Sequence, residues 1–394
     1  MNLNANLHLA YCTHVHRGET WAETFASLQQ HTLRVRDLVC AGRRFGIGLR
    51  LSGRAAQGLK AGTALVEFQR WLDRNQCYVF TIDGFAFGYY YGIQTQDPLY
   101  APDWASPERL AYTNLLFDLL AQLLPAGIEG SVSSLPGSFK GFPLHAEALK
   151  SIRGNLWRCI EHVARVCEQT GRKMHLALEP EPLCLLESSA ETLQLFDRLR
   201  AEHPRDPRLT EHLGVDYDTC HFAVEFEEPQ NALSCLVHHG IKVSKIHLSS
   251  ALTARPTAEA CAALKGLMDP DQLHQVCARD SGGQRIIYRD IRDALLAGPH
   301  PEAASAEAAA LPEWRIHLHI PLGNPPAAPF GNTNEHVLGV LDWLGRHPAH
   351  CAHLEMKTYS WRILPPELRT RDVAERIAAE YAWTLTQLAE RGLA

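Results

Sequence analysis

The chain has 394 residues, of which 46% are hydrophobic and 21% are charged, and its formal net charge is −6. This composition predicts a globular protein with a sizeable core, and the lack of a long Lys/Arg block argues against a nucleic-acid or acidic-membrane partner. The 11 cysteines include no C-x-x-C pair, which predicts reduced thiols and a cytoplasmic location. No signal-peptide pattern or membrane-length apolar run is seen, so we expect no membrane span.

Short apolar runs rich in Val, Ile, Leu and Tyr alternate with longer helical patterns along the chain. Runs that are apolar on both faces are typical of parallel strands covered by helices. The predicted strands are 7–13, 45–51, 77–83, 128–134, 173–179, 213–219, 243–250, 314–322 and 353–359. This set has one strand more than an eight-stranded barrel can use, and the sequence leaves open which one lies outside it.

Helical patterns separate the predicted strands. Apolar residues at spacings of three and four predict a helix within 144–170, with Gly171 well placed to end it. Ser188 and Glu191 have the spacing of a capping box ahead of another helix. One apolar face predicts a last helix near 370–391.

This alternation predicts an α/β protein. Eight strand–helix units closed into a (β/α)8 TIM barrel suit the length, and the lack of a Gly-rich phosphate-binding motif argues against an open doubly wound sheet. Residues 251–313 break the alternation, and we predict that they form an insertion in a late βα loop, with a hairpin between 273–279 and 284–290. We expect the insertion to belong to a single domain, 1–394.

Side chains of the metal-binding types stand at the ends of four predicted strands. Glu179 ends LALE, Asp218 lies in GVDYDTCH, His247 in KIHLSS and Glu355 in HLEMKTY. The carboxyl ends of barrel strands meet at one mouth, where active sites are built. Three carboxylates brought together there repel one another unless a cation lies between them. We therefore predict that these four residues bind a divalent metal: Mn²⁺, Zn²⁺, Mg²⁺, Co²⁺ or Fe²⁺.

Five further polar residues are candidates for substrate binding. His14 and His16 follow the first strand in a βα loop, and Asp83 ends the third strand before a glycine. His317 and His319 share one face of WRIHLHI. The alternative for each histidine is an ordinary solvated or hydrogen-bonded side chain.

The order of a Glu, an Asp followed three residues later by His, a His and a final Glu resembles the xylose isomerase-like barrels. That superfamily contains sugar isomerases, ketose epimerases and endonuclease relatives. The resemblance implies that Glu179, Asp218, His247 and Glu355 hold the metal and that His221 contacts the substrate. It also implies that Glu179 and Glu355 transfer the proton.

Several separated motifs also look like the EboE family of metabolite-traffic proteins. They are HLAYCTHVHRGETWAE, YVFTIDGFAFG, GSVSSLPGSFKG, LALEPEP, GVDYDTCHFAVEFE and EWRIHLHIPL. This resemblance covers almost the full chain and implies a place in secondary metabolism, without defining a reaction. Asp83 stands where the family has Asn, and Lys357 after Glu355 is a second departure.

Together these patterns predict a metal-dependent isomerase or epimerase of a sugar- or cyclitol-like hydroxy-ketone. One alternative is a metal-dependent phosphoesterase on the same fold, for which the endonuclease resemblance implies His221, His317 and His319 as further ligands. The acidic net charge argues against DNA as its substrate. The other alternative is a carrier that binds a metabolite without catalysis.

Overall fold

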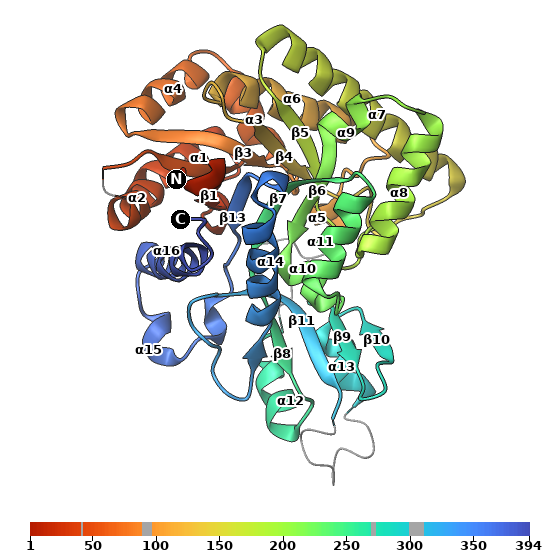
Figure 1. The fold of residues 1–394 in the computed structure, drawn as a ribbon. Helices are drawn as coiled ribbons and strands as arrows, with labels where there is room; N and C mark the ends of the chain where they lie inside the picture. The colour runs from red at the N-terminus through yellow and green to blue at the C-terminus, as the bar shows by residue number, and fades with distance from the viewer. Residues whose placement is uncertain (41, 89–96, 269–272, 299–310) are drawn as a thin grey trace.

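Eight parallel strands form the central sheet of the computed structural model, which describes residues 1–40, 42–88, 97–268, 273–298 and 311–394. The strands are β1 (His8–Tyr11), β2 (Phe45–Arg50), β3 (Cys77–Asp83), β4 (Gly130–Ser134), β5 (Met174–Leu178), β6 (Leu213–Asp218), β7 (Lys242–Leu248) and β13 (His353–Met356). Their order is β1-β13-β7-β6-β5-β4-β3-β2. A parallel bridge between Cys12 and Gly48 links the two outer strands, so the sheet nearly closes (Figure 1). The predicted (β/α)8 barrel is confirmed.

Most of the helices lie around the barrel (Figure 1). The helices are α1 (Trp21–Ser27), α2 (Leu33–Val39), α3 (Gly53–Lys60), α4 (Ala64–Arg74), α5 (Asp97–Tyr100), α6 (Pro107–Leu123), α7 (Ala146–Thr170), α8 (Ser189–Glu202), α9 (Arg208–His212), α10 (Thr219–Val224), α11 (Pro229–His238), α12 (Ala258–Lys265), α13 (Ile291–Ala297), α14 (Asn334–Arg346), α15 (Pro366–Arg369) and α16 (Val373–Ala389). Of these, α12 and α13 lie away from the barrel, beside a second sheet (Figure 1). Gly171 ends α7 with φ 66°, and Ser188 and Glu191 form the predicted capping box of α8. Within the described ranges, none of the helices has the length and apolar character needed to span a membrane.

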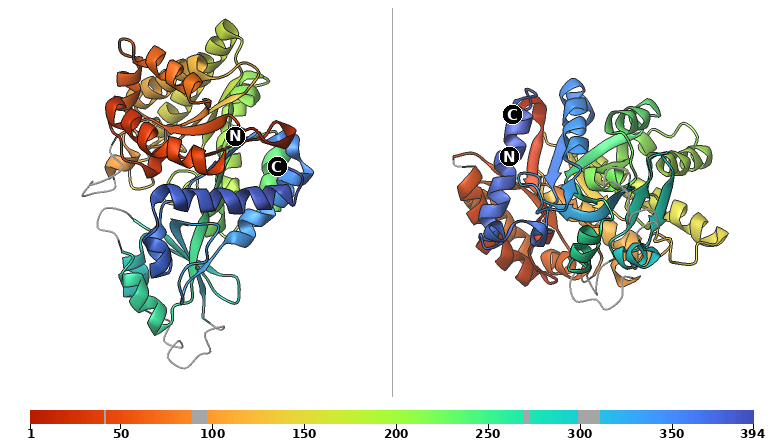
Figure 2. Two further views of the ribbon diagram at one scale, coloured as in Figure 1. Left: turned by 90° about the vertical axis from the view of Figure 1, so that its left-hand side faces the viewer. Right: turned by 90° about the horizontal axis from the view of Figure 1, so that it is seen from below.

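A second sheet is inserted between β7 and α14. Its strands are β8 (Ser250–Ala254), β9 (Val276–Arg279), β10 (Arg285–Tyr288), β11 (Glu313–Ile320) and β12 (Gly331–Asn332). They pair antiparallel in the order β10-β9-β11-β8-β12. Because β8 begins just after β7 ends, the sheet extends from the carboxyl end of the barrel, as two directions of view show (Figures 1 and 2).

The inserted sheet explains the ninth predicted strand. The run 314–322 corresponds to β11, which pairs with β8 and β9 and lies outside the barrel. The predicted hairpin is confirmed, since β9 and β10 pair antiparallel. Parts of the predicted insertion, 269–272 and 299–310, lie outside the described residues.

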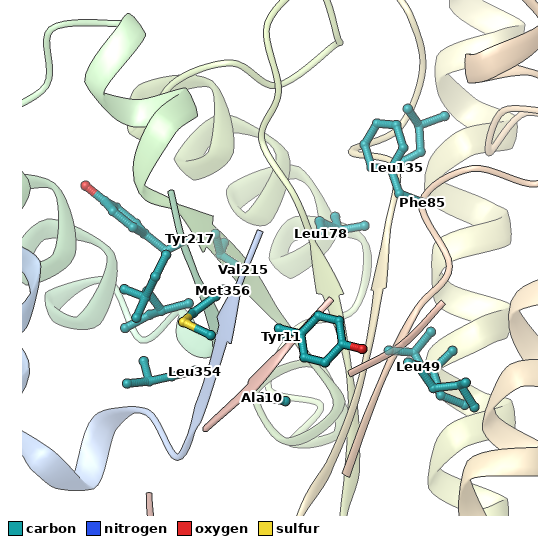
Figure 3. Packing of buried hydrophobic residues seen from close by; sticks show 14 of the residues in the cluster. Ala10, Tyr11, Leu49, Phe85, Leu135, Leu178, Val215, Tyr217, Leu354 and Met356 are labelled. Atoms are coloured by element: carbon teal, nitrogen blue, oxygen red, sulfur yellow. The ribbon is translucent and has the colours of Figure 1, made fainter. Parts of the chain in front are cut away.

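Alternation along the barrel strands separates apolar from charged side chains. Leu354 and Met356 flank Glu355 on β13, and Tyr217 precedes Asp218 on β6. Successive side chains of a strand point to opposite faces, so the apolar residues pack towards the helices and the acids face the barrel interior. Figure 3 shows the three apolar side chains within the buried cluster. The sequence thereby provides a packed outer layer and a charged interior.

Candidate functional site

The register of the parallel strands brings the four predicted metal ligands together. Asp218 on β6 is level with His247 on β7, and Glu355 on β13 is level with His247 from the other side. Glu179 follows β5 directly. All four residues have an exposed fraction of 0%. They therefore form one buried polar cluster at the carboxyl ends of the strands, while metal binding by them remains a prediction.

The imidazole of His247 lies between the two glutamates. Its Nδ1 is 3.1 Å from Glu179 Oε1 and 3.2 Å from Asp216 Oδ2, and its Nε2 is 3.1 Å from Glu355 Oε2. Burial lowers the pKa of His247, but the charge of Asp216, assisted by that of Glu179, raises it to about 9. The ring thus bridges carboxylates on both of its edges.

Two buried lysines complete this charge network. The Lys357 ammonium donates to Glu179 Oε1 at 2.6 Å. Lys245 contacts Glu355 and donates to Ser133 Oγ at 3.2 Å. Burial alone would raise the pKa of Glu179. The positive charges of Lys357 and His247 have the larger effect and bring this pKa well below its usual range. Glu179 is therefore held as a carboxylate.

Glu355 is ionised for the same kind of reason. Burial raises its pKa, but the Lys245 ammonium lowers it more, and the result is about 2.

Sequence reasoning missed Lys245 and Asp216 as members of the cluster. Each stands two residues before a predicted ligand on the same strand, so alternation was a signal that could have found both.

The mouth of the barrel carries a pocket above this cluster, with ≈ 400 Å³ of empty space including space open to solvent. Its lining residues are His14, Arg50, Asp83, Phe85, Ala86, Leu99, Glu181, His221, His317, His319, Lys357 and Tyr359. Five of the six predicted substrate-binding residues are in this set. His16 is not among them, because its Nε2 is engaged by the Tyr11 hydroxyl at 2.9 Å and its ring stacks on His31.

Two pocket histidines have a geometry that suits a cation. His221 Nδ1 donates to the Pro180 carbonyl at 2.8 Å, and His319 Nδ1 donates to the Lys357 carbonyl at 3.0 Å. A carbonyl oxygen only accepts, so these partners assign the proton of each ring to Nδ1. The two Nε2 atoms lie 3.0 Å apart. Burial lowers the pKa of both rings, which leaves two lone pairs facing each other.

Five groups of three His, Cys, Asp or Glu residues in the described chain place possible ligand atoms close together, and two of these groups contain predicted metal ligands on the strands β6 and β7. Asp218, His221 and His319 place ligand atoms within 4.8 Å of one another, and so do Glu179, Asp216 and His247. Oxygens that accept no hydrogen bond within the described chain include Glu179 Oε2, Asp218 Oδ2 and Glu355 Oε1. Carboxylate oxygens and imidazole nitrogens fit a divalent ion, and an Nδ1–carbonyl bond is how metal-binding imidazoles are usually oriented.

Gly48 on β2 makes room for Glu355. A Cβ at this position would lie 1.8 Å from Glu355 Oε1 and 2.8 Å from the Tyr11 carbonyl oxygen. We expect Gly48→Ala to displace the carboxylate and to lower the free energy of unfolding by about 1–3 kcal/mol. Chemical denaturation measures this loss. Gly154→Ala is the control, since nothing lies within 4 Å of its added Cβ; equal stability of the two variants would contradict the prediction.

Comparison with known proteins identifies the fold. No protein-family model and no curated protein matches the chain. An L-ribulose 3-epimerase structure is 12% identical, with 98% of this chain and 95% of that chain covered and a TM-score of 0.51. A D-allulose 3-epimerase from Methylomonas sp. is 11% identical over 98% and 99% of the chains, with a TM-score of 0.51. A D-psicose 3-epimerase from Clostridium cellulolyticum H10, solved with D-tagatose, is 10% identical over 97% and 98%, with a TM-score of 0.50. The chain has the (β/α)8 barrel fold of these structures.

Proposed function

We propose that this protein is a divalent-metal-dependent isomerase or epimerase of a sugar- or cyclitol-like hydroxy-ketone. The observation that carries the proposal is the buried cluster of Glu179, Asp218, His247 and Glu355 beneath a pocket at the barrel mouth. An ionised carboxylate, a cation-binding donor set and a polar pocket are what proton transfer next to a carbonyl needs. The sugar epimerases of similar fold support this reading.

The metal would be held by Glu179, Asp218, His247 and Glu355. Possible ligand atoms of Asp218, His221 and His319 lie within 4.8 Å of one another, so the two histidines are neighbouring nitrogen donors. These side chains offer oxygen and nitrogen atoms, which suit Mn²⁺, Zn²⁺, Mg²⁺, Co²⁺ or Fe²⁺. A bound divalent ion polarises a substrate carbonyl and lowers the pKa of the neighbouring C–H.

Glu179 and Glu355 are the proposed proton-transfer groups. Glu179 is ionised and its Oε2 accepts no hydrogen bond within the described residues, so this oxygen is available to take a proton. Glu355 lies across the His247 ring from Glu179, which suits return of a proton from another direction. Acid–base catalysis of this kind contributes about 10²–10⁴-fold in rate.

The resemblance to EboE supports a place for this reaction in secondary metabolism.

We also propose that barrel and insertion act as one domain, 1–394. The supporting observation is that His319 on β11 of the inserted sheet donates to the backbone of Lys357, just after β13. The pocket therefore has walls from both sheets.

The test is exchange of the substrate α-proton with solvent. Candidate ketoses and keto-cyclitols are incubated with the protein in D₂O and followed by NMR, and the metal content is measured by elemental analysis. We expect bound divalent metal, exchange that stops on chelation and exchange that returns when metal is added. Bound metal without exchange over a broad panel would favour the carrier, and release of phosphate from phosphate esters would favour the phosphoesterase.

A further inference from the structure

Lys357 is a buried ammonium that faces the pocket with unused hydrogen-bonding capacity. It is 6% exposed and is one of the residues that line the pocket. A lysine ammonium has three N–H donors. Among the described residues, Glu179 is its one hydrogen-bond acceptor, through Oε1 at 2.6 Å. The remaining donors are therefore available to a ligand atom in the pocket.

The other basic side chain of the pocket is already engaged. Arg50 donates to the backbone oxygens of Gly18 and Gly88, each at 2.8 Å, and lies 3.1 Å from Glu19 Oε1. His221 and His319 use their Nδ1–H groups on the carbonyl oxygens of Pro180 and Lys357. Lys357 is thus the cationic donor best placed to meet a negatively charged ligand oxygen.

The distance between Lys357 and Glu179 also matters for the chemistry. An oxygen that accepts from Lys357 at an ordinary distance of about 2.8 Å lies next to the Glu179 carboxylate. The other oxygen of that carboxylate, Glu179 Oε2, accepts no hydrogen bond in the described chain. A cation that can hold an oxygen atom and a carboxylate oxygen that can take a proton therefore belong to one contact pair.

We propose that Lys357 is a catalytic residue that binds the carbonyl oxygen of the substrate and stabilises the enolate formed from it. This inference rests on the proposed function. When Glu179 takes the α-proton, the C–H electron pair forms a carbon–carbon double bond and the carbonyl π electrons move onto the oxygen. That oxygen becomes an anion beside the Lys357 ammonium. Return of a proton to carbon reverses these changes and restores the carbonyl group.

Preorganised cations placed where negative charge develops are among the strongest contributors to catalysis. The substrate class follows from this role: a polyhydroxylated ketone whose enolate oxygen reaches Lys357. A sugar acid resembles that anion, because its planar carboxylate places negative charge at the same end of a polyol chain. Such acids should bind more tightly than the matching neutral polyols.

The test compares binding of xylonate and xylitol, an acid and a polyol of the same chain length, by calorimetry with the protein as purified. We expect the wild type to prefer xylonate, and Lys357→Met to weaken xylonate binding about 10- to 100-fold while xylitol binding stays the same. Lys357→Arg should keep part of the preference. Lys242→Met is the matched control, because Lys242 pairs with Glu129 at 3.1 Å at the opposite end of the barrel.

Each outcome decides the matter. Equal xylonate affinity of wild type and Lys357→Met, or no preference for xylonate in the wild type, would overturn the role of Lys357. A preference that depends on Lys357, without any α-proton exchange of ketones, would show an oxyanion-binding pocket and refute the proposed reaction instead. If Lys357→Met does not fold, Lys357→Gln takes its place, because it also removes the charge but keeps a polar side chain. Loss of the xylonate preference in Lys357→Gln, without loss of xylitol binding, supports the role, and an unchanged preference opposes it.

Discussion

Replacing Glu179 by Gln is expected to slow metal-dependent α-proton exchange by about 10²–10⁴-fold. An amide cannot accept the proton, and it removes the negative charge that Lys357 and His247 now contact. The measurement is NMR of the substrate α-proton in D₂O, together with elemental analysis of the variant. Glu179→Asp should retain more metal than Glu179→Gln, but a displacement of about 1 Å can still cost about 10²-fold in rate.

Glu129→Gln provides the control for this experiment. Glu129 is a partly exposed acid paired with Lys242 at the amino end of the barrel, so the same chemical change there should leave exchange unaltered. If Glu179→Gln exchanges the α-proton as fast as the wild type and binds as much metal, Glu179 is not the base. Loss of exchange in both variants would indicate a general disturbance of the barrel.

Replacing Lys245 by Met is expected to lower the free energy of unfolding by about 3–5 kcal/mol. Lys245 has an exposed fraction of 0% and lies between Glu355 and Asp216, so its loss leaves carboxylates buried without their counter-charge. The measurement is urea unfolding at neutral pH. Lys242→Met is the control, since partly exposed pairs such as its contact with Glu129 contribute about 0–1 kcal/mol.

A double variant separates lost charge from lost packing. Lys245→Met combined with Glu355→Gln removes both charges of the pair. The double variant should recover part of the stability lost in the single variant, because the effects of substitutions at residues in contact do not add. A single variant within about 1 kcal/mol of the wild type would contradict the importance of this buried charge.

The barrel was predictable because apolar strands alternating with amphipathic helices are the strongest pattern in the sequence, and burial of those strands is what holds the barrel together. Apolar runs between amphipathic helices correspond to all eight barrel strands. The ninth run, 314–322, has the same appearance, yet β11 pairs antiparallel with β8 and β9. Which neighbours a strand meets depends on the whole topology, and a single apolar run does not contain that information.

The candidate site was predictable where it follows strand ends and less so where it depends on contacts between distant segments. Asp218, His247 and Glu355 lie level with one another because parallel strands in register bring such positions together. The engagement of His16 by Tyr11 and His31 depends on packing of the helical segment Leu28–Thr32 against the end of β1, which spacing in the sequence does not reveal. The contact of Lys357 with Glu179 likewise joins two residues that follow different strands and lie far apart in the chain.

The inserted sheet has a consequence for how this pocket can change over time. Its strand β11 carries His317 and His319, whereas Glu179, Asp218, His247 and Glu355 come from the barrel. Substitutions in β11 away from His319, whose ring lies beside Asp218 and His221, can therefore alter the shape and polarity of one wall without moving the carboxylates below. A lineage could exchange one ligand for another by changing this strand, so the greatest divergence among related pockets is expected on the β11 side.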